Sequence, residues 1–237
     1  MIGFDKVSKH FWTREGARVV LHDADLSIAR DERIGVLAQP GAGKSVVCSL
    51  LAGIERPSSG RVLPPGGDCW RLGDSTVFQV YLTAEQNVRI IADLRGVDPD
   101  WTSAYVQDLS ELGPRYYESL QTYSSSMRGR LGFALSMALP CDYFIADQGI
   151  SVGIGRYRDK CEMLLNERLA DIGMFLITSN PSFAKRSCSS FAVMRDGGFV
   201  RCADYREAVD LFDEREDEFA AVDNLIAAWP EGRRVRG

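Results

Sequence analysis

Residues 34–45 contain the feature that most restricts how this chain can fold. An apolar run, Ile34-Gly35-Val36-Leu37, leads into a glycine-rich turn over residues 38–43, and a helical pattern opens at Lys44-Ser45. In this spacing the backbone N–H groups of the turn line a nest for phosphate, and the helix N-terminus adds partial positive charge. Lys44 can reach the β- and γ-phosphates of a nucleotide, and Ser45 can hold the Mg²⁺ that bridges them. The stretch predicts a phosphate-binding loop, with a glycine-rich turn carrying a chance lysine as the alternative.

The composition restricts the partners of the chain. Its 237 residues are 45% hydrophobic, enough for one large domain or two small ones. The net charge of −5 argues against a nucleic-acid partner, whose binding would need a basic surface. Six cysteines without a CxxC pair, and only two histidines, cannot assemble a zinc site of the usual spacing, so we expect reduced thiols in a cytosolic protein.

Neither a leader nor a membrane span is expected. The first residues, Met1-Ile2-Gly3-Phe4-Asp5-Lys6, lack the basic start and apolar core of a signal peptide. No run approaches the roughly 18 apolar residues that a membrane-spanning helix requires. Any association with a membrane is therefore expected to depend on a partner.

Apolar patterns on both sides of the loop predict the elements that frame it. Residues 4–28 alternate in a strand-like way, which predicts a small antiparallel sheet ahead of the loop. After Lys44, the apolar residues share one helical face until Gly53, which is placed to close the helix in a left-handed conformation. A turn at residues 57–60 then leads into a strand at residues 61–63.

Residues 80–140 carry almost entirely helical signals and predict an inserted helical lobe. Residues 83–86, Thr-Ala-Glu-Gln, have the form of a capping box, in which the first side chain and the last satisfy each other's backbone N–H groups. Gln79 is expected to end a strand immediately before this lobe.

After the lobe, strand and helix signals alternate. Residues 143–146 and 174–178 are short apolar runs typical of buried parallel strands, and a helical pattern lies between them. This alternation predicts an α/β architecture with a parallel sheet. A hairpin is expected around Asp196-Gly197-Gly198, and the acidic run at residues 213–218 is interpreted as a solvated helix face.

Four further features accompany the loop in a fixed order. Asp147 ends an apolar strand, which would place its carboxylate where it can hold Mg²⁺ through water. Phe11 lies well before the loop and Gln79 lies after it. Tyr123-Ser124-Ser125-Ser126-Met127 opens a helix ahead of the acidic strand end. Each motif is weak alone, but their joint order and spacing are specific.

In that order the chain resembles the ATP-binding subunits of ABC transporters over nearly its whole length. Segments 53–60, 124–131 and 194–198 are most similar to the ATPases that drive export of capsular polysaccharide and O-antigen. The resemblance implies a P-loop NTPase (RecA-like) core with a parallel sheet, an N-terminal antiparallel β-subdomain and an inserted helical lobe. It also implies one nucleotide-binding domain over residues 1–237, with residues 1–79 and 141–237 as the core and residues 80–140 as the lobe.

The resemblance assigns a role to each motif. Phe11 would stack on adenine, Gln79 would sense the γ-phosphate, and Ser124 would contact the γ-phosphate bound to the opposite subunit. The implied nucleotide-binding residues are Phe11, Ala38, Gln39, Pro40, Gly41, Ala42, Gly43, Lys44, Ser45, Val46, Gln79, Ser124, Ser125 and Ser126. The implied Mg²⁺ ligands are Ser45, Gln79 and Asp147.

Each of these roles has a structural alternative. Phe11, or Trp12 beside it, could pack against a sheet edge. Gln79 could be an ordinary polar residue at a strand end, and the three serines could form no more than a helix N-cap.

Five positions depart from the family pattern. Gln148 stands where a glutamate would polarise the attacking water, and Asn180 follows Ser179 where a histidine is expected. The other departures are Ala38, Ser126 and Ile154. An amide cannot accept a proton, and general-base catalysis is typically worth about 10²- to 10⁴-fold, so slow turnover with preserved nucleotide binding is expected.

The resemblance implies ATP and Mg²⁺ as cofactors and a membrane permease as partner. It also implies a homodimer, or a pair with a second ATP-binding subunit, held at the cytoplasmic face of the inner membrane. Two functions stay open: a motor that couples ATP hydrolysis to export of capsular or other cell-surface polysaccharide, and an ATP-gated subunit with little hydrolysis. A soluble P-loop kinase is disfavoured because the helical lobe has no role there. The end of the chain at Gly237 favours capsule-type export over O-antigen exporters that carry a carbohydrate-binding module.

Overall fold

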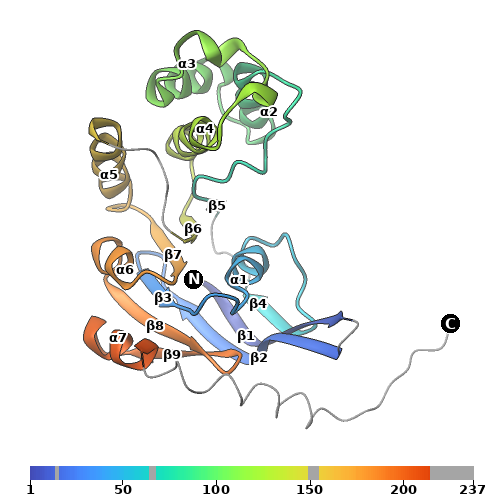
Figure 1. Cartoon of the computed structure of the whole chain (residues 1–237), viewed down its shortest axis with the longest axis vertical. Coiled ribbons are helices and arrows are strands. Elements are labelled where there is room, and N and C mark those ends of the chain that lie inside the picture. Colours follow the sequence, from blue (N-terminus) through green and yellow to red (C-terminus); the bar gives the residue numbers. More distant parts are fainter. Residues whose placement is uncertain (14–15, 64–67, 149–154, 214–237) are drawn as a thin grey trace, which may run out of the picture.

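The computed structural model describes residues 1–13, 16–63, 68–148 and 155–213 and contains two sheets (Figure 1). The larger sheet is six-stranded in the described part of the chain, and its neighbours run parallel except for the last pair, which is antiparallel. In spatial order its strands are β5 (Cys69–Arg71), β6 (Tyr143–Asp147), β7 (Gly173–Thr178), β3 (Arg33–Leu37), β8 (Ser190–Arg195) and β9 (Gly198–Cys202). The predicted parallel α/β sheet is confirmed.

The smaller sheet is antiparallel, as expected for the N-terminal residues. Its strands are β2 (Gly16–Ile28), β1 (Ile2–Thr13) and β4 (Ser59–Leu63), with β1 in the centre. The β1–β2 register shifts between Phe4 and His10. Because such irregularities bend and twist a strand, they alter its course shortly before Phe11.

Alternate side chains of the larger sheet supply two hydrophobic cores. Tyr143 and Ile145 on β6 join β1, β2 and helix α1 (Lys44–Leu51) in one core, whereas Phe144 and Ala146 face the other. The second core also contains side chains from α5 (Arg156–Arg168), α6 (Pro181–Ser187), α7 (Tyr205–Asp213) and the helical lobe. Burial on both faces explains why the central strands are apolar throughout, since neither face needs polar residues.

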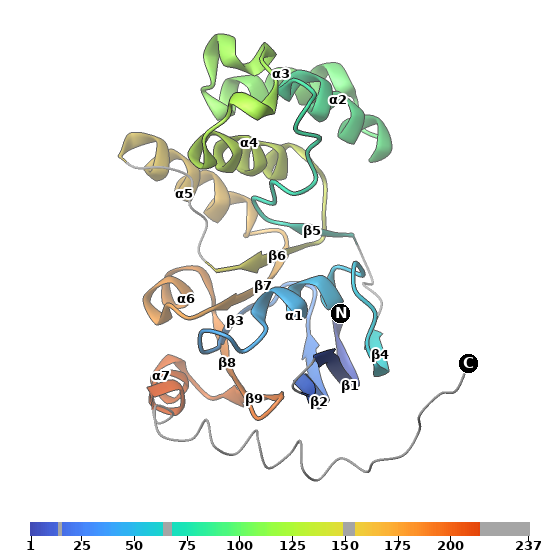
Figure 2. The same cartoon turned by 45° about the vertical axis from the view of Figure 1, so that its right-hand side comes forward.

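The helices of the lobe lie beyond the β5–β6 edge of the larger sheet, and β1, β2 and β4 lie beside α1 (Figure 2). The lobe comprises α2 (Ala84–Leu94), α3 (Pro99–Ser110), η1 (Gly113–Tyr117), η2 (Leu120–Thr122) and α4 (Ser125–Ala138). The capping box at Thr83 and Gln86 is confirmed, with both reciprocal hydrogen bonds present. None of the helices in the described segments combines the length and apolar character that a bilayer-spanning helix requires.

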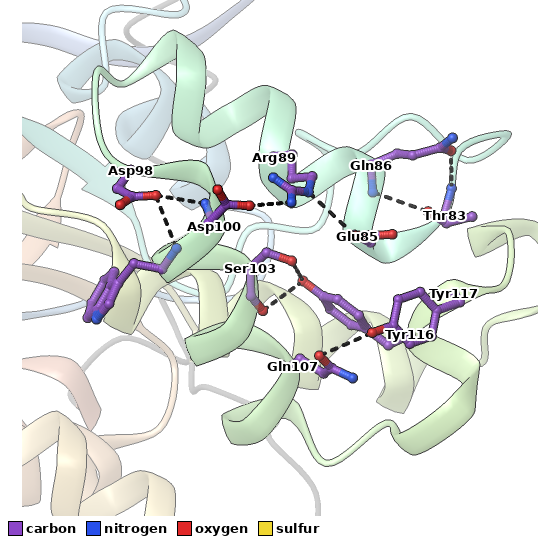
Figure 3. Close-up of polar contacts among 11 residues, drawn as sticks. Thr83, Glu85, Gln86, Arg89, Asp98, Asp100, Ser103, Gln107, Tyr116 and Tyr117 are labelled. Carbon is purple, nitrogen blue, oxygen red and sulfur yellow. Dashed lines mark hydrogen bonds and ion pairs between the residues drawn. The ribbon is translucent and has the colours of Figure 1, made fainter.

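Polar side chains hold α2 and α3 together (Figure 3). Arg89 on α2 pairs with Glu85 on its own helix and with Asp100 at the start of α3. Tyr116 lies in η1, which follows α3. Its hydroxyl donates to the Ser103 backbone carbonyl at 3.1 Å and lies 3.2 Å from Ser103 Oγ. Because Tyr116 is fully buried, leaving this hydroxyl unpaired would be costly, and the contact fixes η1 against α3.

Helix α4 lies directly against the chain that follows β5. A Cβ atom added at Gly132 would lie 2.8 Å from the Gly73 carbonyl oxygen, so only glycine permits this approach. Ser136 Oγ accepts hydrogen bonds from Trp70 Nε1 at 3.0 Å and from the Gly73 N–H at 2.9 Å. The base of the lobe is therefore joined to the edge of the sheet.

One predicted element is wrong. Gln79 does not end a strand, because the strand in this region is β5 and Gln79 lies in the irregular segment after it. The Asp74 carboxylate accepts from the N–H and the hydroxyl of Thr76, and this local turn takes the chain out of the sheet. Ile154 and the acidic run from residue 214 onward lie outside the described residues.

Candidate functional site

The predicted phosphate-binding loop lies between the C-terminal end of β3 and the N-terminus of α1. Gly41 and Gly43 have φ values of 83° and 88°, in the left-handed region that favours glycine. A Cβ atom at Gly43 would also lie 2.5 Å from Val20 Cγ1. The loop begins as an extension of β3, because the N–H of the fully buried Ala38 donates to the Thr178 carbonyl at 3.0 Å. A methyl group is therefore accommodated at Ala38.

Lys44 is buried and folded back over the loop. Its ammonium group donates to the carbonyl oxygens of Gln39 at 2.8 Å and Ala38 at 3.3 Å. Burial lowers the pKa of Lys44, and the nearby negative charge of Asp147 opposes that shift. The loop thus contains one ammonium group whose counter-charge comes from the end of a different strand.

Ser45 and Asp147 are joined directly. Ser45 Oγ donates a hydrogen bond to Asp147 Oδ2, while Asp147 Oδ1 is buried without a hydrogen-bond partner. The ends of β3 and β6 meet here because both strands run in the same direction, with β7 between them. Hydroxyl and carboxylate oxygens are the ligands that Mg²⁺ prefers, and the orphaned oxygen is a site for such an ion or its water. The residues present therefore fit Mg²⁺.

The two amide residues that depart from the family pattern follow adjacent strands. Gln148 has a φ of 68°, and its N–H donates to the Ile177 carbonyl at 2.8 Å. Its side-chain oxygen accepts from Ser179 Oγ at 3.4 Å. Asn180 caps α6, since its Oδ1 accepts from the Phe183 N–H at 3.2 Å.

The remaining predicted residues lie on separate segments. Phe11 is 37% exposed on β1. The Gln79 N–H donates to Asn87 Oδ1 at 2.7 Å, which anchors this loop residue to α2. Ser124 is the N-cap of α4, as in the structural alternative, and Ser125 and Ser126 are exposed in the first turn. The hydrogen bonds of Gln79 and Ser124 are to neighbours in their own part of the chain, whereas Ser45 and Asp147 meet across the fold.

Two contacts to the loop were missed by sequence reasoning. Arg18 pairs with Phe11 across the β1–β2 ladder, and its guanidinium donates to the Gly41 carbonyl at 2.9 Å. Gln39 Nε2 donates to the Phe212 carbonyl of α7 at 3.0 Å. The strand alternation around Arg18 could have placed it on the same face as Phe11. The contact with α7 has no signal in the sequence.

Comparisons with known proteins show which family the chain is similar to. A family model described as "ABC transporter" matches residues 21–151. The capsule polysaccharide export ATP-binding protein CtrD of Neisseria meningitidis serogroup B is 37% identical over 212 residues, covering 90% of this chain and 98% of that protein. The ATP-binding protein BexA of Haemophilus influenzae is 35% identical and covers 91% of this chain and 100% of that protein. The polysialic acid transport ATP-binding protein KpsT of Escherichia coli is 31% identical, and the match covers 84% of this chain and 90% of that protein.

A solved structure shows the same fold. The ATP-binding cassette MJ0796, in a dimeric post-hydrolysis state bound to ADP and Pi, superposes with a TM-score of 0.67 at 19% identity. The match covers 84% of this chain and 96% of that one. The expected P-loop NTPase fold class is confirmed. With a family match over more than half of its length and relatives above 30% identity, the chain belongs to the ABC transporter family of ATP-binding proteins.

Proposed function

We propose that this chain binds Mg-ATP at Lys44, Ser45 and Asp147 and couples that binding to export of capsular or other cell-surface polysaccharide through a membrane permease. The observation that carries the nucleotide site is the Ser45–Asp147 contact, which leaves one buried carboxylate oxygen without a partner beside a phosphate-binding loop. The export role is supported by the names of CtrD and KpsT, which are a capsule polysaccharide export protein and a polysialic acid transport protein.

Different residues of the site bind different parts of the nucleotide in this proposal. The backbone N–H groups of residues 39–46 surround the phosphates, and Lys44 leaves its carbonyl partners to bind the β- and γ-phosphates. Ser45 and Asp147 would hold Mg²⁺, which supplies positive charge to the phosphates when bound. Gln79, on the segment before α2, is the third proposed ligand. Phe11 provides the stacking surface for adenine, because its ring is partly exposed on the strand beside the loop.

A second ATP-binding subunit completes the site in this proposal. Ser124, Ser125 and Ser126 are exposed at the N-terminus of the 14-residue helix α4, where backbone N–H groups and the helix dipole favour an anion. In a head-to-tail pair they contact the γ-phosphate held by the opposite copy. The MJ0796 structures are dimeric, which supports a homodimer or a pair with a second ATP-binding subunit.

Hydrolysis is slow in this proposal. Gln148 stands next to Asp147, and its amide cannot serve as a general base, which costs about 3 to 5 kcal/mol of transition-state stabilisation. Asn180 is engaged as the cap of α6. The alternative is an ATP-gated subunit that closes and opens with nucleotide occupancy and shows little or no turnover.

Titration calorimetry with Mg-ATP tests the nucleotide site. We expect heat of association from the parent protein and none from Lys44→Ala, while the control Lys6→Ala, at an exposed lysine of β1, behaves like the parent. Single-turnover phosphate release then separates the two modes: a slow rate above background supports the motor, and a background rate supports the gated subunit. Equal heats from the parent and Lys44→Ala would refute the proposed site.

The transport role has its own test. Co-expression with a candidate permease should allow the two proteins to be purified together from membranes. A strain lacking this chain should lose its surface polysaccharide, and the parent gene, but not Lys44→Ala, should restore it. Recovery by the Lys44→Ala variant would show that export does not depend on nucleotide binding by this chain.

A further inference from the structure

The aromatic ring of Phe11 has a buried cation on one of its faces. Lys9 Nζ lies 4.7 Å from the centre of the Phe11 ring, within the distance at which an ammonium group is attracted to an aromatic face. Lys9 is 7% exposed, which is uncommon for a lysine, whereas Phe11 retains 37% exposure. One face of the ring is therefore covered by charge, and the ring remains accessible from elsewhere.

Lys9 is itself held in place by the segment that follows α1. Its ammonium group donates to Glu55 Oε1 at 2.6 Å and to the Arg56 carbonyl at 2.8 Å. The same segment is bonded to the backbone of β1, because the Ser58 N–H donates to the Ser8 carbonyl at 2.8 Å. The Lys9 ammonium thus has two oxygen partners and an aromatic face, so its position is well defined.

Helix α1 connects this anchor to the phosphate-binding loop. The loop precedes the first turn of α1, and Glu55 and Arg56 follow shortly after its last turn. A rigid helix of eight residues therefore sets the separation between Lys9 and the groups that surround phosphate. Lys9 thus ties β1, the strand that carries Phe11, to the segment that follows α1.

We propose that Lys9 is a positioning residue for the nucleotide base: it fixes the Phe11 ring relative to α1, so that adenine stacks on the face opposite the ammonium group. This inference rests on the proposed nucleotide site and extends it. The Lys9 ammonium draws electron density toward its own side of the ring, which makes the opposite face a better partner for an electron-rich purine. Lys9 contributes to base binding without touching the phosphates.

The test compares a ligand with a base to one without. Mg-ATP and Mg-tripolyphosphate are titrated into the parent, Lys9→Met, Phe11→Ala and the double variant. We expect Lys9→Met to weaken Mg-ATP binding by about 2- to 30-fold, with the upper figure set by the full strength of a cation–π contact, and to leave Mg-tripolyphosphate binding unchanged. The double variant should bind Mg-ATP no more weakly than Phe11→Ala, because Lys9 acts through that ring.

Two controls separate positioning from general stability. Lys6→Met removes the same charge from an exposed site on β1 and should change neither affinity. Glu55→Gln keeps an oxygen that accepts from Lys9 and should retain most of the Mg-ATP affinity. Equal losses for both ligands in Lys9→Met, additive losses in the double variant, or no loss at all would overturn the proposal. Failure of the parent to bind either ligand would instead refute the nucleotide site.

Discussion

The hydroxyl of Ser179 donates to the side-chain oxygen of Gln148 at 3.4 Å, linking the residues that follow β7 and β6. A glutamate at 148 would keep this hydrogen bond, because a carboxylate also accepts from a hydroxyl. Gln148→Glu should therefore fit the site and supply the missing proton acceptor. We predict a rise of about 10²- to 10⁴-fold in single-turnover phosphate release.

Gln148→Ala is the matched control, since it removes the hydrogen bond without adding a base. Its rate of phosphate release should stay near that of the parent. A Gln148→Glu variant no faster than the parent would show that the group missing at Asn180, rather than the base, limits the reaction.

Ser45→Ala should remove the Mg²⁺ dependence of nucleotide binding. The parent is expected to bind ATP more tightly with Mg²⁺ than without it, because Ser45 and Asp147 present oxygen ligands beside the loop. In Ser45→Ala the two dissociation constants should converge, whereas Ser45→Thr, which keeps the hydroxyl, should resemble the parent. Titrations in Mg²⁺ and in EDTA measure the difference, and an undiminished Mg²⁺ effect in Ser45→Ala would contradict the assignment.

Gly43→Ala should damage both stability and binding. The residue has a φ of 88°, and the added methyl would lie 2.5 Å from Val20 Cγ1, so strain and overpacking act together. We expect a loss of about 2 to 4 kcal/mol in the free energy of unfolding, measured with urea, and loss of the ATP heat.

Gly53→Ala provides the comparison at the other end of α1. Gly53 has a φ of 70°, but an added Cβ would meet nothing within 4 Å. Only backbone strain remains, so the cost should be about 1 kcal/mol with ATP binding retained. Equal costs at the two positions would mean that the contact with Val20 is unimportant.

The free energy of unfolding should fall at acidic pH because of Glu32. Burial raises the pKa of the Glu32 carboxyl group. Hydrogen bonds from Arg201, Ser190 and the Ala29 N–H together lower it by more, so the net pKa lies below the ordinary value of 4.5. A lowered carboxyl pKa stabilises the fold above about pH 4.5, and that contribution is lost as the pH falls through the folded-state value.

Glu32→Gln tests this sign. The variant should be about 1 to 3 kcal/mol less stable than the parent at neutral pH, and the gap should narrow below pH 4.5. Urea unfolding at several pH values measures both curves. A gap that stays constant down to pH 3 would contradict the assignment.

Much of the fold follows from local patterns in the sequence. Residues 37–45 contain the end of a strand, a turn and the start of a helix. The glycines of the turn adopt left-handed conformations and the helix begins directly after them, so few other backbone conformations are available to this stretch. The runs at 143–146 and 174–178 are apolar at nearly every position, which is typical of a strand buried on both faces. The capping box at Thr83 is a local hydrogen-bond pattern, and it formed as expected.

Contacts between distant segments were harder to predict. The strand expected before Gln79 is absent because Asp74 and Thr76 form a turn, whereas the sheet edge is taken by the three residues of β5. The approach of Arg18 to Gly41 depends on how the two sheets meet around α1, which periodicity does not specify. From the sequence, Lys9 would be expected to be exposed, as lysines on alternating strands usually are. Its burial depends on the partners Glu55 and Arg56, which are distant in the sequence.

The tight approach of Gly132 to Gly73 also has a mechanical consequence. No side chain separates α4 from the chain after β5 at this point, and the hydrogen bonds of Ser136 to Trp70 and Gly73 fasten the two segments together there. A rocking movement of the helical insertion would pivot near this contact, and the far ends of α2 and α3 would travel through the widest arc. Paired spin labels placed there, rather than at the pivot, would report such rocking with the greatest sensitivity.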